Sequence, residues 1–136
     1  MLGQFNSKSS LILESSLNNL LIVEDNLFVR KNIFKATKSI KSIGSIKQAE
    51  SLTEAISLFK NTSFELVVLD LKLPDGNGVE LLKMFKENKI ETKVLVFSMS
   101  TELKKTCLRY GAFAFFDKAK DFDNLIEVIK KPELKN

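Results

Sequence analysis

The fold is decided by one stretch, which reads LVVLDLKLPDGNG at residues 66–78. An apolar run at 66–69 leads directly into Asp70, and the Pro, Gly and Asn residues that follow indicate a loop. Short apolar runs bounded by turn signals are typical of central strands buried on both faces. Ligands bind at the carboxyl ends of such strands, so Asp70 is a candidate functional residue. Taken alone, it is equally well explained as an ordinary Asp that starts a loop.

The composition favours one globular domain in a reducing compartment. The chain has 136 residues, 44% of them apolar, which suits a single core. Cys107 is the only cysteine, which excludes an internal disulfide, and we expect it to pack as a small apolar residue. The chain contains no histidine, which excludes histidine-based catalysis and histidine metal ligands. Without a membrane-length apolar run or a cleavable signal, we expect a cytoplasmic protein.

The charge pattern indicates solvated helix faces rather than a nucleic-acid surface. The net charge is +4, and the 21 basic residues are spread along the chain in small groups such as Arg30 and Lys31. No long basic block is present. We therefore expect no direct nucleic-acid binding and no membrane binding.

Residues 1–18 are rich in Ser and Asn, and we expect a flexible arm there, with a short extended piece at 11–13. Residues 19–131 form the expected domain, and 132–136 a tail. Because the chain stops at Asn136, we expect a stand-alone domain with no output domain behind it.

Apolar runs alternate with helical patterns after the arm. Strands are predicted at 20–23, 43–49, 66–70, 94–97 and 112–116. Helices are predicted at 29–40, 52–59, 79–85, 101–110 and 122–129, with a capping box at Ser51 and a cap at Asp121. This alternation predicts an α/β fold, a parallel sheet with helices on both faces and right-handed crossovers.

Polar residues follow the first, third, fourth and fifth predicted strands. They are the pair Glu24 and Asp25, then Asp70, Ser98 and Lys118. In a doubly wound sheet these strand ends share one edge, so the side chains are expected to converge. Separately, the acid pair is explained by a helix N-terminus and Lys118 by a solvated loop.

Together these segments resemble the receiver domain of bacterial two-component response regulators, over residues 19–131. The resemblance rests on LIVEDN at 21–26, LDLKLPDGNG at 69–78, FS at 97–98, GA at 111–112 and FFDK at 115–118. It implies a flavodoxin-like doubly wound (βα)5 sheet of five parallel strands in the order 2-1-3-4-5.

The resemblance implies a magnesium site around a phospho-acceptor. Asp70 would be the nucleophile that forms an acyl phosphate. Asp25, Asp70 and the backbone carbonyl of Lys72 would bind Mg²⁺, with Glu24 acting mostly through water. The cation would relieve repulsion among the carboxylates and neutralise charge on the phosphoryl oxygens.

The resemblance also implies a switch. Lys118 and the Ser98 hydroxyl would each contact a phosphoryl oxygen, and Ser98 would be coupled to Phe115 on the fifth strand. The family often has Tyr at that position, and Phe lacks its hydroxyl, so plain packing of Phe115 remains an alternative.

Residues 101–131 would form the partner surface. This face carries Lys104, Lys105, Arg109 and Lys120, which favours an acidic partner. The protein would be a monomer or a weak homodimer through the same face.

Three residues depart from the family pattern. Ala119 replaces the usual Pro after the lysine, which makes the Lys118 loop less rigid. Met99 follows Ser98 where a small residue is usual, and Lys72 lies two residues past Asp70. Both long side chains restrict access to Asp70, so we predict slow dephosphorylation.

The leading hypothesis is a response regulator that takes a phosphoryl group from a histidine kinase or phosphotransfer protein. Such a protein is not an enzyme beyond its own phosphorylation and dephosphorylation. A haloacid dehalogenase-type phosphohydrolase would need a second Asp where Lys72 stands. A pseudo-receiver that binds partners without phosphorylation is the remaining alternative.

Overall fold

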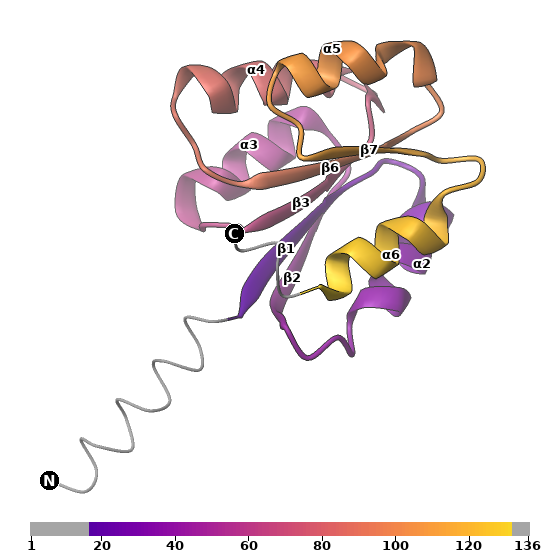
Figure 1. Ribbon diagram of the computed structural model, residues 1–136. Helices are drawn as coiled ribbons and strands as arrows, with labels where there is room; N and C mark the ends of the chain where they lie inside the picture. The colour runs from indigo at the N-terminus through magenta and orange to yellow at the C-terminus, as the bar shows by residue number, and fades with distance from the viewer. Residues whose placement is uncertain (1–16, 132–136) are drawn as a thin grey trace, which may run out of the picture.

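A central sheet of five parallel strands organises the protein (Figure 1). The computed structural model describes residues 17–131, so the expected tail and the first 16 residues of the expected arm lie outside it. The strands are β1 (Asn18–Val23), β2 (Ile43–Ala49), β3 (Leu66–Leu69), β6 (Lys93–Ser98) and β7 (Ala114–Asp117). Their order is β2-β1-β3-β6-β7, which confirms the predicted flavodoxin-like order.

Helices cover both faces of the sheet. The α-helices in residues 17–131 are α2 (Leu27–Thr37), α3 (Leu52–Asn61), α4 (Val79–Glu87), α5 (Lys104–Arg109) and α6 (Phe122–Lys130). Helices α3, α4 and α5 lie on one face, and α2 and α6 on the other (Figure 1). The α/β doubly wound architecture is therefore confirmed.

The inner strands β1, β3 and β6 explain why the sequence shows unbroken apolar runs. Along β1, Leu21 and Val23 enter the core on the α3–α5 side, and Leu20 and Ile22 enter the core under α2 and α6. Burying each such side chain contributes about 1.5–3 kcal/mol. Cys107 is also fully buried, as expected, and burial raises the pKa of its thiol.

The loop after β3 contains a small hairpin that the sequence did not predict. Strand β3 ends at Leu69, one residue earlier than expected, and Asp70 lies just beyond it. Strands β4 (Lys72–Leu73) and β5 (Gly76–Asn77) then pair antiparallel. At Gly76 the backbone has φ +152°, which only glycine adopts without strain, and this permits the turn.

Most other element boundaries differ from the prediction by one to three residues, and two of the differences have a clear local cause. The helix expected at 101–110 begins as a 3-10 turn, η1 (Thr101–Leu103). The last strand begins at Ala114 rather than Ala112, because Gly111 and Ala112 still close helix α5. Their amides donate to the carbonyls of Leu108 and Cys107, with Gly111 at φ +96°.

Of the two helix N-caps predicted from the sequence, the structure has one and lacks the other. Ser51 caps α3 by accepting from the Glu54 amide at 3.1 Å, but the Glu54 carboxylate accepts from Glu50 rather than from Ser51. The prediction for Asp121 is wrong: its side chain makes no cap bond to α6. Its carboxylate turns back and accepts from the Asp117 amide at 3.0 Å.

Within residues 17–131, every helix is too short or too polar to cross a membrane.

Candidate functional site

The carboxyl edge of the sheet brings the predicted acidic residues together. Oxygen atoms of Glu24, Asp25 and Asp70 lie within 4.8 Å of one another. Glu24 and Asp25 follow β1, and Asp70 follows the adjacent β3. The Asp70 amide donates to the Val23 carbonyl at 2.9 Å, which holds the two strand exits side by side.

Asp70 is buried and held at both carboxylate oxygens. Its exposed fraction is 6%. Oδ1 accepts from the Leu71 amide at 2.8 Å, and Oδ2 lies 3.1 Å from Nζ of Lys118. The acceptor proposed from the sequence is thus oriented by its own loop and by one ammonium group.

Glycine is required beside Asp70 for reasons of space. The Gly78 amide donates to the Leu71 carbonyl at 2.8 Å, which closes the hairpin loop against the end of β3. A Cβ atom at position 78 would lie 2.6 Å from the Asp70 carbonyl oxygen. Any other residue would push the backbone of Asp70 out of place.

Glu24 is the most buried carboxylate of the site, at 1% exposure. Oε1 lies 2.7 Å from Nζ of Lys118, and Oε2 accepts from the Asn26 amide at 3.0 Å. Burial raises the pKa of Glu24, and the bond from Lys118 only partly offsets this. For Lys118, burial opposes the charged form, but the bond to Glu24 and the charge of Asp70 outweigh it, so the pKa of the ammonium is raised.

The donor set fits a hard divalent cation. Carboxylate oxygens, in a cluster with one exposed member, Asp25, are the ligands that Mg²⁺ prefers, and the exposed side leaves room for retained waters. The single positive charge of Lys118 lies beside two of the three carboxylates and offsets one unit of their negative charge. Lys72 lies in β4, where its backbone pairs with Asn77.

Ser98 ends β6 and is buried, at 1% exposure. Its Oγ accepts from the Ser100 amide at 3.0 Å, which leaves the hydroxyl proton to be donated elsewhere. The Ser98 carbonyl accepts from the Lys118 amide at 3.0 Å, so these two predicted residues are neighbours. Met99 is 63% exposed, and its side chain lies largely in solvent.

Phe115 lies in β7, and its side chain is partly buried against the core. It lines a hollow of about 380 Å³ with Thr101, Lys104, Asp117, Lys120 and Asp121. Ala119, where the family usually has Pro, donates its amide to the Asp117 carboxylate at 2.8 Å. A Pro could not make this bond, so the Lys118 loop has a hydrogen bond in place of the ring.

Arg30 is the first residue that sequence reasoning placed wrongly. The prediction put it on a solvated face, but its exposed fraction is 7%. Its guanidinium bonds the Glu24 carbonyl at 2.8 Å and the Gln48 side chain at 3.1 Å. The spacing of Arg30, Ile33 and Thr37 along the inward stripe of α2 was the available signal.

Asp75 is a second residue whose contacts were not predicted from the sequence. Its carboxylate accepts from the Leu52 and Thr53 amides at 2.8 Å and from the Thr53 hydroxyl at 2.7 Å. These bonds, led by the one from the Thr53 hydroxyl, lower the pKa of Asp75 to about 2. The bonds fasten the hairpin loop to the amino end of α3.

Comparison with known proteins identifies the family to which this chain belongs. The family model for the response regulator receiver domain matches residues 20–130. The chain belongs to the response regulator receiver domain family. The resemblance inferred from the motifs is therefore confirmed. Receiver domains bind Mg²⁺ at an acidic pocket, and this chain has an acidic cluster at the edge of its sheet.

Relatives share the receiver over part or all of their length. The chain is 36% identical over 77 residues to a protein-glutamate methylesterase/protein-glutamine glutaminase from Clostridium acetobutylicum, a match that covers 48% of this chain and 22% of that protein. A Francisella receiver domain is 25% identical, with a TM-score of 0.74 over 82% of this chain and 93% of that one. A Thermotoga maritima response regulator, solved in complex with Mg²⁺–BeF, is 23% identical, with a TM-score of 0.74 over 85% and 99%.

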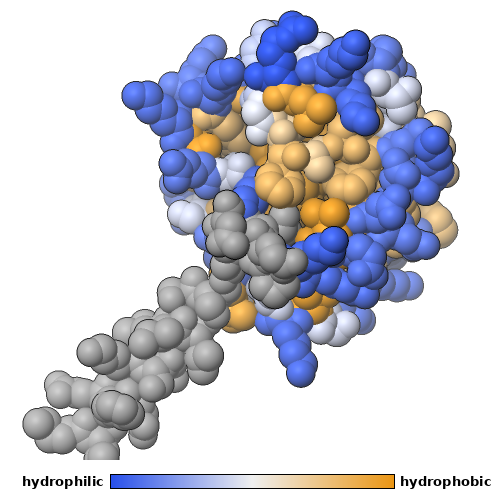
Figure 2. Space-filling view, in the orientation of Figure 1, coloured by the Kyte–Doolittle hydropathy of each residue, from blue (hydrophilic) through white to orange (hydrophobic). Residues whose placement is uncertain are grey.

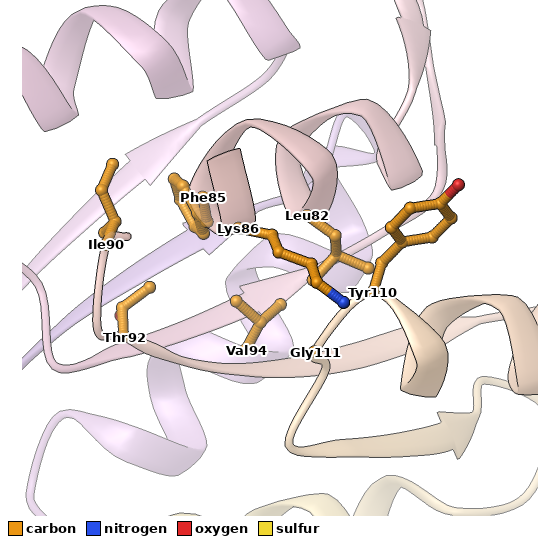
Figure 3. Close-up of a pocket in the computed structure, with 8 residues that line it drawn as sticks. All are labelled: Leu82, Phe85, Lys86, Ile90, Thr92, Val94, Tyr110 and Gly111. Carbon is orange, nitrogen blue, oxygen red and sulfur yellow. The ribbon is translucent and has the colours of Figure 1, made fainter. Parts of the chain in front are cut away.

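The receiver also has a pocket away from the acidic cluster. Apolar surface gathers between the upper helices and the sheet, with charged side chains around it (Figure 2). A pocket of about 170 Å³ lies between α4, the beginning of β6 and the end of α5, with Leu82, Phe85 and Val94 in its wall (Figure 3). Val94 and Ser98 lie at opposite ends of β6, so this pocket is separate from the candidate site.

Proposed function

We propose that this receiver accepts a phosphoryl group on Asp70 from a histidine kinase or phosphotransfer protein, in a Mg²⁺-dependent reaction. The observation that carries the proposal is the buried Asp70 carboxylate, with Lys118 at 3.1 Å and two further carboxylates within 4.8 Å. Lys118 can pair with an added phosphoryl oxygen, and Glu24 and Asp25 complete a hard-oxygen site.

The residues divide the chemistry among them. An Asp70 oxygen attacks phosphorus, the bond from phosphorus to the donor's histidine nitrogen breaks, and that nitrogen keeps the electron pair. Glu24, Asp25, Asp70 and the Lys72 carbonyl would hold Mg²⁺, which neutralises charge on the phosphoryl oxygens when it is bound. Lys118 shifts from the carboxylates toward one phosphoryl oxygen.

The phosphorylated state would be read out through residues 101–131. Ser98 donates its free proton to a second phosphoryl oxygen, which favours repositioning of its loop and of Phe115. The hollow beside Phe115 has two lysines and two aspartates in its lining, so an acidic output partner is supported instead by the exposed basic side chains on this face, Lys104, Lys105, Arg109 and Lys120. A monomer or a weak homodimer through the same face, in the cytoplasm, completes the proposal.

A direct test uses small-molecule donors. The protein is incubated with Mg²⁺ and acetyl phosphate, and the intact mass is measured; beryllofluoride binding is followed by fluorine NMR. We expect one phosphoryl adduct and one bound beryllofluoride in the wild type, and neither in Asp70→Asn. If both probes fail in the wild type, the pseudo-receiver alternative replaces this proposal. An unchanged adduct in Asp70→Asn would move the acceptor elsewhere.

A further inference from the structure

Arg30 is a buried charge that the proposed chemistry does not use. It lies in the first turns of α2, only six residues after Glu24, and its three nitrogens each have a partner. Nη1 donates to the Glu24 carbonyl at 2.8 Å, Nε donates to Oε1 of Gln48 at 3.1 Å, and Nη2 lies 3.4 Å from a carboxylate oxygen of Glu50. Burying a guanidinium is costly, so its contacts merit an explanation beyond helix packing.

The bond to Glu24 acts on the peptide that precedes Asp25. The Glu24 amide donates to the Ala49 carbonyl at 3.0 Å, and the Glu24 carbonyl accepts from Arg30. Both peptide planes around Glu24 are therefore fixed. Asn26, on the other side, caps α2 through its bond from the Val29 amide. Asp25 is exposed, and its direction depends on these two neighbours.

The other two contacts anchor Arg30 to β2. Gln48 is in β2 and Glu50 follows it directly, so the guanidinium bridges the ends of β1 and β2. A planar guanidinium can serve partners in several fixed directions at once, which a lysine ammonium cannot do with the same geometry. The anchor restricts where the Glu24 carbonyl can go.

We propose that Arg30 is a positioning residue that orients the Glu24–Asp25 pair for a divalent cation. The inference rests on the proposed function, because it deepens the account of the same site. Arg30 does not touch the cation in this scheme; it acts through the Glu24 carbonyl. Groups that orient metal ligands in this way strongly affect metal affinity.

The charge of Arg30 makes the inference sharply testable. A nearby positive charge repels a cation, so removing charge alone would make Mg²⁺ bind more tightly. Loss of positioning would make Mg²⁺ bind more weakly. The two explanations therefore predict opposite signs for the same substitution.

The experiment is a Mg²⁺ titration by calorimetry, with the amide resonances of Asp25 and Asn26 followed by NMR. For Arg30→Met we expect about a tenfold rise in the Mg²⁺ dissociation constant. Arg30→Lys keeps the charge and should also bind more weakly. Gln48→Ala removes one exposed anchor and should show a smaller rise in the same direction. Lys31→Met is the matched control, which removes an exposed charge from the same helix and should leave affinity equal or slightly higher.

The Mg²⁺ affinities of these variants decide whether Arg30 positions the Glu24–Asp25 pair. Wild-type or tighter affinity in Arg30→Met overturns the inference. If that variant does not fold, wild-type affinity in both Arg30→Lys and Gln48→Ala overturns it. If the wild type itself binds no Mg²⁺, the metal part of the proposed function fails and the inference fails with it. If the wild type binds Mg²⁺ and the variants bind it with the same affinity, the inference about Arg30 fails but the proposed function does not.

Discussion

Two halves of the same sheet edge are built in different ways. At the exits of β1 and β3, Glu24 and Asp70 are buried, and every carboxylate oxygen has a backbone amide or the Lys118 ammonium beside it. At the exit of β6, the Ser98 hydroxyl is held by one neutral bond from Ser100, and Met99 is mostly exposed. A neutral hydrogen bond contributes only about 1 kcal/mol. The acidic half is therefore fixed in advance, whereas the Ser98 half can rearrange at low cost.

The largest expected effect comes from removing the charge that ties the acidic half together. Lys118→Met should lower the free energy of unfolding by about 2–3 kcal/mol, because it leaves two buried carboxylates unpaired. Urea unfolding at neutral pH measures this. Mg²⁺ should restore part of the loss, since the cation replaces the missing charge. Lys120→Met, an exposed change in the same loop, is the control. Equal midpoints for the two variants would show that the acidic half is not held by Lys118.

The pH dependence of the free energy of unfolding tests how burial of Glu24 affects the acidic half. Its pKa is raised above the ordinary 4.5 by burial, so the folded state binds the proton more tightly than the unfolded state. The resulting stability is present below pH 4.5 and is lost as pH rises through the raised value. The free energy of unfolding of the wild type minus that of Glu24→Gln should fall over this window. Urea unfolding in Mg²⁺-free buffer from about pH 4 to pH 8 tests the sign. A difference that increases with pH contradicts the burial argument.

A smaller effect is expected where the hairpin loop joins α3. Asp75→Ala removes the acceptor for two amides and a hydroxyl, so its urea midpoint should fall at neutral pH, and Asp75→Asn should fall less. The pKa of Asp75 is about 2 when folded, below the ordinary 3.8. The difference between wild type and Asp75→Ala is therefore full above pH 3.8 and disappears as pH falls toward about 2. A difference that persists at the acid end would mean that the carboxylate charge is irrelevant.

The smallest stability effect is expected in the Ser98 half. Met99→Ala should change the free energy of unfolding by no more than about 0.5 kcal/mol, because the side chain is already in solvent. The phosphoryl half-life on Asp70 should nevertheless shorten, since a long side chain beside Ser98 restricts attacking water. Leu108→Ala, another exposed apolar change, should leave the half-life unchanged. An unchanged half-life in Met99→Ala removes Met99 from the explanation, and Lys72→Ala then tests the other long side chain.

The strand exits were predictable because their signals are local. A strand that is buried on both faces needs an unbroken apolar run. A charged residue such as Asp70 therefore shows where the strand leaves the core. The parallel order then brings Asp70, Ser98 and Lys118 to one edge, whatever the side-chain details. Regular alternation thus predicted a parallel sheet and the convergence of these residues at one edge, while the strand order came from the resemblance to the receiver family.

The partners of these residues were not predictable in the same way. Lys118 lies nearer to Glu24 than to Asp70, at 2.7 Å against 3.1 Å, a difference set by side-chain geometry across the edge. Arg30 was assigned to solvent because arginine is rarely buried, although its position falls on the inward stripe of α2. The bond of Asp75 to α3 joins segments that are more than 20 residues apart in the chain. The burial of Arg30 could thus have been predicted, but the partners in contacts of this kind depend on packing that no local pattern encodes.

Gly78 extends the site to a residue with no chemistry of its own. Its backbone has ordinary helical angles, so only the space beside the Asp70 carbonyl excludes a side chain. In a genetic screen for loss of signalling, substitutions at this position should therefore be recovered alongside those at Asp70. Even alanine, the mildest substitution, should score as severe. Mutational intolerance at position 78 would then mark the space needed by the loop that holds Asp70, the proposed acceptor, rather than another participant in phosphoryl transfer.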